Sequence, residues 1–240
     1  MNILLLGYGK MGKIIGEIAE SRGHFLAGKI NLENISELEK INPADVDVVI
    51  EFSQPESALG NITWAIERGI PVVSGTTGWL EHLPEVSKLT QEKNGAFFYA
   101  SNYSIGVNIF FKVNEFLAKL MNETSGYQVA IEEIHHTQKK DAPSGTAITL
   151  AEGIIQNLDV KTQWNLTGQM ADSEQSVPIT SKRIDPAPGT HIITYSSDID
   201  TIEISHTAHS RMGFALGAVL VAEWIKNKKG VLSMNDFLSF

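Results

Sequence analysis

The first hundred residues alternate between short apolar runs and amphipathic segments. Residues 2–6 form a continuous apolar run closed by Gly7, which is typical of a strand buried on both faces. Residues 11–21 then carry apolar side chains at helical spacing. The alternation continues, with strands predicted at 24–30, 47–52, 70–74 and 96–100 and helices predicted at 56–68 and 81–93. Strands that alternate with helices predict an α/β fold with a doubly wound parallel sheet.

The pattern changes after Asn102. The following segments predict helices at 105–121 and 146–157 and strands at 128–135, 183–185, 191–197 and 200–206. Because no helix separates the last strands, this half is predicted to be a second, α+β domain with an open mixed sheet. Residues 162–181 are polar and weakly patterned, which predicts a surface loop.

The last helical segment, residues 214–226, is too apolar to lie free in water. We therefore expect this helix to pack back onto the first domain. The predicted domains are residues 1–104 together with 210–240, and residues 105–209.

Composition excludes several classes of protein. Of the 240 residues, 42% are hydrophobic and 20% are charged, as in soluble globular proteins. The formal net charge of −9 argues against a nucleic-acid partner, which requires a basic surface. The absence of cysteine excludes disulfides, cysteine-based metal sites and the thioester chemistry of phosphorylating semialdehyde dehydrogenases. No apolar run reaches about 18 residues and no leader-like segment begins the chain, so we expect a cytoplasmic protein without membrane contact.

A glycine-rich turn separates the first predicted strand from the first helix. Gly7, Gly9 and Gly12 have G-x-G-x-x-G spacing, which lets a pyrophosphate approach backbone N–H groups at a helix N-terminus. This setting predicts that the first domain is a Rossmann-type, dinucleotide-binding domain. Two alternatives exist. The turn is almost a P-loop, but Ile14 stands where Ser or Thr must hold magnesium, and a tight turn that binds nothing would also use glycine.

Two polar turns follow later strands at the same edge of the predicted sheet. They are 75–78 (Gly-Thr-Thr-Gly) and 100–103 (Ala-Ser-Asn-Tyr). Ligands bind at the carboxyl edge of such sheets, so these turns predict a lining for the nicotinamide half of a cofactor. At the adenosine end, Asn31 could bond a ribose hydroxyl, whereas Lys29 could attract a 2′-phosphate. Both NADH and NADPH therefore stay open.

Titratable residues are concentrated between 132 and 147. If 128–135 is a strand, His135 and the adjacent His136 point to opposite faces and cannot easily ligate one metal. A zinc site of His135, His206 and His209 has no acid or cysteine at ligand spacing, so we predict no metal. Ser144 opens the predicted helix at 146–157, where it would cap the helix. Free N–H groups at that helix start would also form a carboxylate site.

With these residues in view, the chain resembles the dihydrodipicolinate (4-hydroxy-tetrahydrodipicolinate) reductase family of the diaminopimelate–lysine pathway. The most specific shared segment is Glu133-x-His135-His136-x-x-Lys139-x-Asp141-Ala142-Pro143-Ser144-Gly145-Thr146-Ala147. Further shared segments are 7–12, 52–55, 75–78, 102–108 and 203–206. The resemblance runs through nearly the whole chain. Asn31 departs from the family, which often has an acid near this position.

The resemblance implies site residues and an assembly. His135 and Lys139 are implied to be proton donors, and the substrate dicarboxylate is implied to be bound by His136, Lys139, Gly145 and Thr146. The predicted cofactor contacts, with Asn31 added at the adenosine end, are Gly7, Tyr8, Gly9, Lys10, Met11, Gly12, Asn31, Gly75, Thr76, Thr77, Ala100, Ser101, Asn102 and Tyr103. Residues 105–209 are implied to bind substrate and to assemble a homotetramer.

The implied reaction is hydride transfer from NADH or NADPH to a cyclic, unsaturated imine dicarboxylate. Hydride addition to the conjugated system builds an enamine that must be protonated, and His135 would supply or relay that proton. Lys139 would pair with a substrate carboxylate. Two other hypotheses stay open: a sensor module that binds NAD(P)H without turnover, and a reductase of a related imine or semialdehyde.

Overall fold

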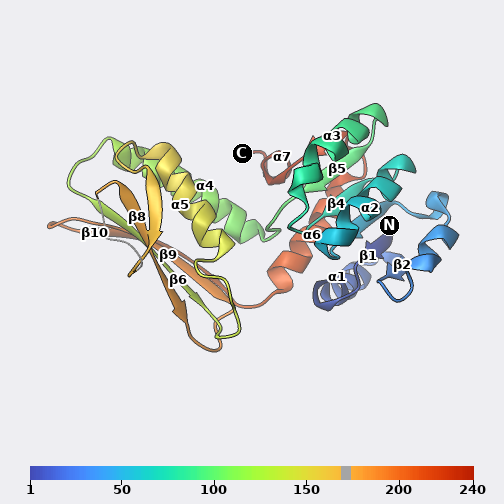
Figure 1. The fold of residues 1–240 in the computed structure, drawn as a ribbon, viewed down its shortest axis with the longest axis horizontal. Helices are drawn as coiled ribbons and strands as arrows, with labels where there is room; N and C mark the ends of the chain where they lie inside the picture. The colour runs from blue at the N-terminus through green and yellow to red at the C-terminus, as the bar shows by residue number, and fades with distance from the viewer. Residues whose placement is uncertain (169–173) are drawn as a thin grey trace. The chain divides into compact units, whose positions relative to one another are not determined.

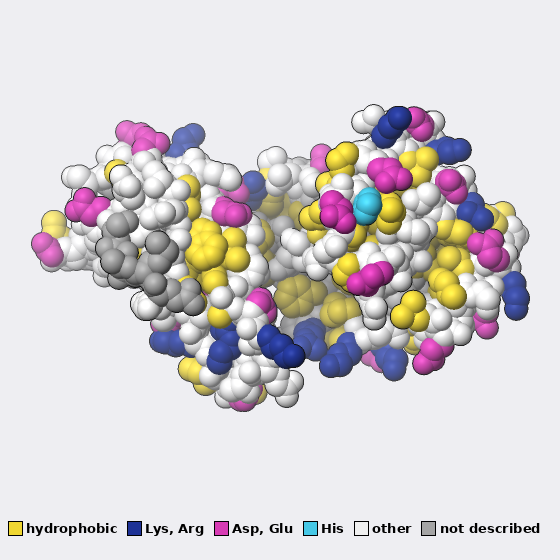
Figure 2. Space-filling model, viewed as in Figure 1, with side chains coloured by type: hydrophobic (Ala, Val, Ile, Leu, Met, Phe, Trp, Pro, Cys, Tyr) yellow, Lys and Arg dark blue, Asp and Glu magenta, His cyan; other side chains and the backbone are white. Residues whose placement is uncertain are grey.

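The computed structural model describes residues 1–168 and 174–240. The chain divides into two compact units (Figure 1): unit 1 comprises Met1–Ile105 and Met212–Phe240, and unit 2 comprises Gly106–Arg211. Acidic and basic side chains are interspersed over unit 1 on the face that Figure 2 draws. None of the helices in the described ranges is long and apolar enough to cross a membrane.

Unit 1 is built on a six-stranded sheet with the strand order β11-β5-β4-β3-β1-β2. Its strands are β1 (Asn2–Leu6), β2 (Phe25–Ile30), β3 (Val48–Glu51), β4 (Val72–Ser74), β5 (Ala96–Tyr99) and β11 (Gly230–Leu232). Its helices are α1 (Lys10–Ser21), α2 (Pro55–Glu67), α3 (Leu83–Glu92), α6 (Met212–Ile225) and α7 (Met234–Leu238), with short 3-10 helices at Ile35–Lys40, Pro43–Asp45 and Leu80–His82. Every neighbouring pair of strands is parallel, which confirms the predicted sheet.

The side chains of successive β1 residues pack into two different hydrophobic clusters. Ile3 and Leu5 pack in a cluster with side chains of α1 and α6, whereas Leu4 and Leu6 pack in a second cluster with side chains of α2. A strand covered on both faces has no polar side, which explains why its sequence is continuously apolar.

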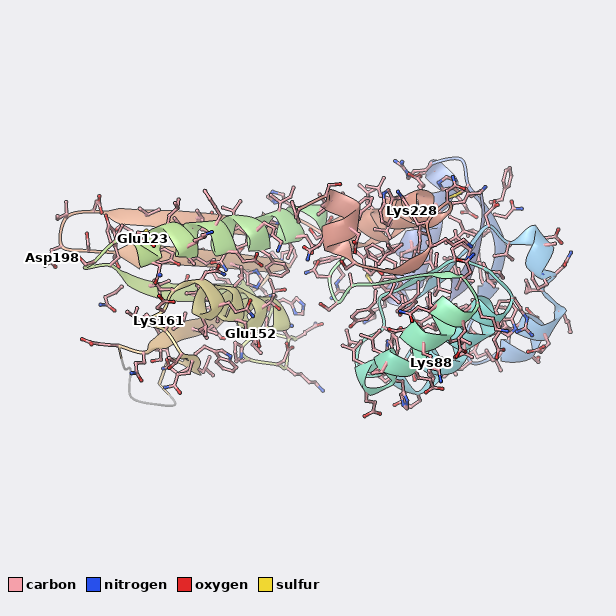
Figure 3. The ribbon with its side chains drawn as sticks, turned by 90° about the horizontal axis from the view of Figure 1, so that it is seen from above. Lys88, Glu123, Glu152, Lys161, Asp198 and Lys228 are labelled. Atoms are coloured by element: carbon pink, nitrogen blue, oxygen red, sulfur yellow. The ribbon has the colours of Figure 1, made fainter. Side chains whose placement is uncertain are left out.

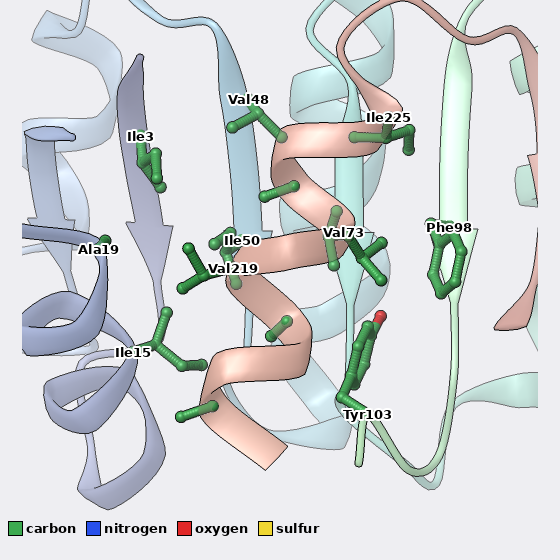
Figure 4. Packing of buried hydrophobic residues seen from close by; sticks show 14 of the residues in the cluster. Ile3, Ile15, Ala19, Val48, Ile50, Val73, Phe98, Tyr103, Val219 and Ile225 are labelled. Atoms are coloured by element: carbon green, nitrogen blue, oxygen red, sulfur yellow. The ribbon is translucent and has the colours of Figure 1, made fainter. Parts of the chain in front are cut away.

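Helix α6 packs within unit 1 although it follows unit 2 in the sequence. Figure 4 shows Val219 of this helix beside Ile15 and Ile50 in the buried cluster. A Cβ at Gly217 would lie 1.8 Å from the carbonyl oxygen of Tyr103, so this close approach requires glycine. Burial of its apolar side chains is the main force that holds the helix in place.

Unit 2 carries a five-stranded sheet with the order β10-β9-β6-β8-β7. The strands are β6 (Gln128–His135), β7 (Gln163–Leu166), β8 (Ser176–Arg183), β9 (Gly189–Ser196) and β10 (Thr201–Ala208), and the helices are α4 (Ile105–Asn122) and α5 (Gly145–Asn157). Strands β10, β9 and β6 are antiparallel, whereas β6, β8 and β7 are parallel, as the predicted mixed sheet allows. Asp198 lies in the turn between β9 and β10 (Figure 3).

The sequence prediction was wrong in one region of unit 2. Residues 162–181 were expected to form a loop, and the strand at 183–185 was expected to begin at Arg183. Instead β7 and most of β8 lie within 162–181, and β8 ends at Arg183; residues 169–173 of the expected loop lie outside the described residues. Their apolar side chains, Trp164 and Leu166 in β7 and Val177 and Ile179 in β8, alternate with polar ones over only a few positions. Both strands gain their hydrogen bonds from pairing with β6 and with each other, which a local pattern does not reveal. The short elements β11 and α7 were also not predicted.

Candidate active site

The three glycines of the first turn have different structural roles. Gly7 has a φ of +97°, and a Cβ there would lie 2.0 Å from the Phe52 carbonyl oxygen. A Cβ at Gly12 would lie 2.1 Å from the Gly7 carbonyl oxygen. A Cβ at Gly9 would meet nothing within 4 Å. Gly7 and Gly12 therefore serve the close packing of the turn, whereas Gly9 leaves open the space that a ligand would enter.

We expect Gly9→Ala and Gly12→Ala to fail in different ways. Gly12→Ala should lower the free energy of unfolding by about 1–3 kcal/mol, because its methyl group would meet a backbone oxygen. Gly9→Ala should change that free energy by less than about 0.5 kcal/mol, yet raise the Kd for NADH because the methyl group enters open space. Urea unfolding and a fluorescence titration with NADH measure the two quantities. Equal losses of stability in the two variants would contradict these roles.

Two cavities meet at this turn. One of about 280 Å³ is lined by Tyr8, Gly9, Asn31 and Ser53, among others. The other, of about 340 Å³, is lined by Gly9 and Ser53 as well, and by Lys10, Met11, Gly75, Thr76 and Thr77. Because they share lining residues, the two cavities provide continuous space for an extended ligand, and the open position at Gly9 fits a pyrophosphate between its ends.

The predicted cofactor residues after β5 differ in what they can offer. The Tyr103 side chain is buried, and its hydroxyl donates to the Ser74 carbonyl oxygen at 2.6 Å. Its ring packs against Phe52 and Phe98, with centroid distances of 5.5 and 5.8 Å. Ala100 is buried, whereas Ser101 is exposed. The Tyr103 side chain therefore supports the wall of the site from inside the core.

The loop after β2 uses Asn31 to hold its own shape. The Asn31 side-chain oxygen accepts from the backbone N–H groups of Glu33 and Asn34, at 2.8 and 3.2 Å. Asn31 also lines the cavity of about 280 Å³. Lys29 Nζ lies 5.3 Å from the Tyr8 ring centroid and 3.7 Å from Glu20. This end of the cavity therefore offers a neutral amide with a cation nearby.

In unit 2, the end of strand β6 carries a buried carboxylate and a buried histidine. Glu133 has no exposed surface, and its Oε2 contacts Nδ1 of His135. Arg183, the β8 residue paired with His135, donates from Nη2 to Glu133 Oε1 at 2.9 Å. Burial by itself would raise the pKa of Glu133, but hydrogen bonds from His135, Ser181 and Arg183 outweigh it and lower the pKa to about 2. Glu133 is therefore ionised at neutral pH and orients the His135 ring.

Arg183 also holds the turn that follows His135. Its guanidinium donates to the backbone carbonyl oxygens of Lys139 (3.3 Å), Asp141 and Lys182 (2.8 Å). One side chain thus connects both predicted proton donors, His135 through Glu133 and Lys139 through its backbone. Sequence reasoning missed Arg183, because Glu133, Lys139 and Asp141 lie more than 40 positions away and become its neighbours only through the β6–β8 pairing.

A second buried histidine, His191 of β9, adjoins His135. The ring centroids are 5.2 Å apart. Burial, assisted by the charge of His135, lowers the pKa of His191 to about 4, so His191 is neutral at neutral pH. Its Nε2 lies 3.1 Å from Ser144 Oγ, which also accepts from Ala147 N–H as the predicted helix cap. His191 therefore connects His135 to the start of α5, which sequence reasoning did not foresee.

The predicted carboxylate-binding residues lie on the turn and the helix that follow β6. Lys139 Nζ is 2.8 Å from Asp141 Oδ2, and this ion pair outweighs burial to lower the pKa of Asp141. Gly145 and Thr146 are the first residues of α5, and within the described ranges their N–H groups have no internal acceptor. A cavity of about 300 Å³ opens beside His136. The structure thus supplies a cation and a helix N-terminus for a carboxylate.

Glu133, His135 and His191 also form a group of possible metal ligands, whose ligand atoms lie within 4.8 Å of one another. Arg183 already pairs with the carboxylate, and Glu133 contacts His135 directly. A metal ion on that carboxylate would be repelled by the guanidinium. The group therefore fits a hydrogen-bonded site better than a metal centre, and the absence of a metal stays a prediction. The alternative zinc set shares only His135 with this group.

Comparisons with known proteins match this chain to one family along its whole length. Residues 1–103 match the family described as dihydrodipicolinate reductase, N-terminus, and residues 106–238 match dihydrodipicolinate reductase, C-terminus. The 4-hydroxy-tetrahydrodipicolinate reductase of Christiangramia forsetii is 50% identical over 239 residues, which cover 100% of this chain and 98% of that protein. The 4-hydroxy-tetrahydrodipicolinate reductase of Methanocaldococcus jannaschii is 35% identical, over 95% of this chain and 83% of that protein.

A solved structure shares the fold. The dipicolinate-bound dihydrodipicolinate reductase of a Paenisporosarcina species has a TM-score of 0.74 and 22% identity, over 99% of each chain. Both halves of the sequence and the fold lead to the same conclusion. The chain belongs to the dihydrodipicolinate reductase family.

Proposed function

We propose that this protein reduces 4-hydroxy-tetrahydrodipicolinate to tetrahydrodipicolinate with NADH or NADPH, in the biosynthesis of lysine and diaminopimelate. The observation that carries this proposal is the 50% identity, over the whole chain, to the Christiangramia forsetii reductase. The buried carboxylate–histidine pair beside Lys139 adds a chemical reason, because the reaction needs a proton donor and a cation for a dicarboxylate.

In the proposed mechanism, the glycine turn of unit 1 would hold a nicotinamide cofactor, which would supply a hydride when bound, and His135 of unit 2 would supply the proton. Glu133 holds Nδ1 of His135, which leaves Nε2 to hand a proton to the reduced substrate. Gly189 keeps space free at this atom, since a Cβ there would lie 3.0 Å from His135 Nε2. Lys139 exchanges Asp141 for a substrate carboxylate, and His136 with the Gly145 and Thr146 N–H groups binds the dicarboxylate.

We propose that both nucleotides are accepted, because the neutral Asn31 amide neither repels a 2′-phosphate nor binds two ribose hydroxyls as a carboxylate does. Asn31→Asp is expected to raise the KM for NADPH relative to that for NADH by roughly tenfold, because one lost or gained hydrogen bond of a charged group has about this effect. Initial rates at varied cofactor concentration measure the ratio. Asn227→Asp, an exposed change of equal charge, is the control. An unchanged ratio of the KM for NADPH to the KM for NADH would indicate that the ribose does not bind at Asn31.

The proposed reaction is tested by adding purified protein to freshly condensed aspartate semialdehyde and pyruvate. We expect loss of reduced-nicotinamide absorbance that requires the condensation product, with NADH and with NADPH. Cofactor binding without absorbance loss would instead support the sensor module. Loss only with another imine or semialdehyde would support the related reductase. The homotetramer and the cytoplasmic location stay predictions. Light scattering after size-exclusion chromatography tests whether the protein is a homotetramer.

A further inference from the structure

Strand β3 ends in a buried carboxylate that the proposed mechanism does not use. Glu51 has no exposed surface and lies between β1 and β4 in the middle of the unit 1 sheet. Burial of a carboxylate is unfavourable unless charge or hydrogen bonds compensate it. Within the described residues no cation forms an ion pair with Glu51. Its compensation therefore has to come from hydrogen bonds.

The hydrogen bonds to Glu51 divide between its two oxygens. Oε1 accepts from the backbone N–H of Ser53 at 3.0 Å, from the Thr76 hydroxyl at 2.8 Å, and from the Ser53 hydroxyl. Oε2 accepts from the hydroxyl of Ser74, a residue of β4, at 2.8 Å. One oxygen thus binds two different turns, and the other binds the sheet.

The two turns held by Oε1 line the same cavity. Ser53 follows β3 and Thr76 follows β4, and both contribute to the cavity that also contains Gly9 and Lys10. The Thr76 hydroxyl additionally accepts from Ser53 N–H at 2.8 Å, so it connects the turns directly. Because this hydroxyl is buried and engaged on both sides, its contribution is to the position of the turns.

We propose, on the basis of the proposed function, that Glu51 is a positioning residue for the nicotinamide cofactor. Its charge holds the turns after β3 and β4 in one arrangement, so that the backbone of both is ready for the cofactor before it binds. Hydrogen bonds to a charged acceptor are about twice as strong as those to a neutral one. The neutral but similarly shaped Gln should therefore loosen both turns while preserving the volume of the site.

The test compares Glu51→Gln with Ser74→Ala, the matched control that removes the hydrogen bond at Oε2 and leaves both turns untouched. We expect Glu51→Gln to raise the Kd for NADH roughly tenfold, the effect of weakening hydrogen bonds to a charged group, and to leave the Kd for pyridine-2,6-dicarboxylate unchanged. Amide hydrogen exchange should become faster at residues 52–57 and 75–79 in this variant. Ser74→Ala should show neither change.

Two results would overturn the proposal. One is an unchanged NADH affinity in folded Glu51→Gln protein, and the other is an equal loss of both ligands, which would indicate general destabilisation. If Glu51→Gln does not fold, Thr76→Val removes the hydroxyl between Oε1 and the second turn, and the same outcomes apply. If the unaltered protein bound no nicotinamide nucleotide, the proposed function would fail, and hydrogen exchange would still decide whether Glu51 holds the turns.

Discussion

Replacing His135 by Gln is expected to lower kcat by roughly 10²- to 10⁴-fold, the contribution of a positioned general acid. The KM for the dicarboxylate should change much less, because the proposed carboxylate contacts come from Lys139 and the start of α5. Gln preserves approximate size and a hydrogen bond to Glu133, so the fold should tolerate the change. Steady-state rates at varied substrate concentration, with saturating cofactor, separate the two parameters.

The matched control for His135 is His82→Gln, which alters a histidine of unit 1 whose ring nitrogens lie near the carboxylates of Glu81 and Glu85. Its kcat should equal that of the unaltered protein. An unchanged kcat in His135→Gln would remove His135 from the mechanism and transfer the proton donor to Lys139. A rise in KM with constant kcat would make His135 a binding residue.

Replacing Arg183 by Gln is expected to lower the free energy of unfolding by about 3–5 kcal/mol, the effect of breaking a buried ion pair by removing one partner. Glu133 has no exposed surface, so its charge would be left with His135 and Ser181 alone. The turn at Lys139 and Asp141 would also lose its donor, and we expect kcat to fall at least about tenfold because catalytic geometry is sensitive to small displacements. Urea unfolding followed by circular dichroism measures the stability.

The loss of stability in Arg183→Gln is expected to depend on pH in a definite direction. The pKa of Glu133 falls from 4.5 to about 2 in the folded protein, so its pairing stabilises the fold fully above about pH 4.5 and is lost as the pH falls towards 2. The stability difference between the unaltered protein and Arg183→Gln should therefore shrink between pH 5 and pH 2. A difference that is constant over this range would show that Arg183 acts only through the three backbone carbonyls.

Lys182→Gln is the control for Arg183. Lys182 precedes Arg183 in the same strand and pairs with Glu132, but its side chain is 45% exposed and that of its partner is 30% exposed. An exposed pair contributes at most about 1 kcal/mol. If Lys182→Gln lowered the free energy of unfolding as much as Arg183→Gln, any change at the end of β8 would disturb the sheet.

Much of the fold was predictable because its signals are local. The continuous apolar run of β1 and the helical spacing of α1 each report burial within a few residues, and the alternation of such segments predicted the parallel sheet of unit 1. In contrast, the apolar alternation in β7 and β8 covers only a few positions, and these strands are defined by their partners. So short an alternation within a polar segment is too weak a signal to predict a strand.

The candidate site also has one part that was predictable from local sequence and another that was not. Glycine spacing and the His-His-Lys segment identified the two chemical regions from residue type and separation along the chain. Three residues that contact these regions were missed as site residues: Glu51, Arg183 and His191. Each acts through contacts with residues that are remote in sequence or that belong to neighbouring strands, and an isolated Glu, Arg or His carries no local mark of burial.

The sequence by itself determined most of the strands and helices of unit 1, though not β11 and α7. It also located the glycine-rich turn that would suit a dinucleotide, and the side chains that can donate a proton or bind a carboxylate. Only the tertiary structure decided that Gly9 is open while Gly7 and Gly12 are packed, that Glu133 is ionised against His135, and that Arg183 connects His135 with the Lys139 turn. The reason is physical: apolar periodicity and residue chemistry are properties of short segments, whereas burial, charge pairing and pKa depend on which distant strands become neighbours.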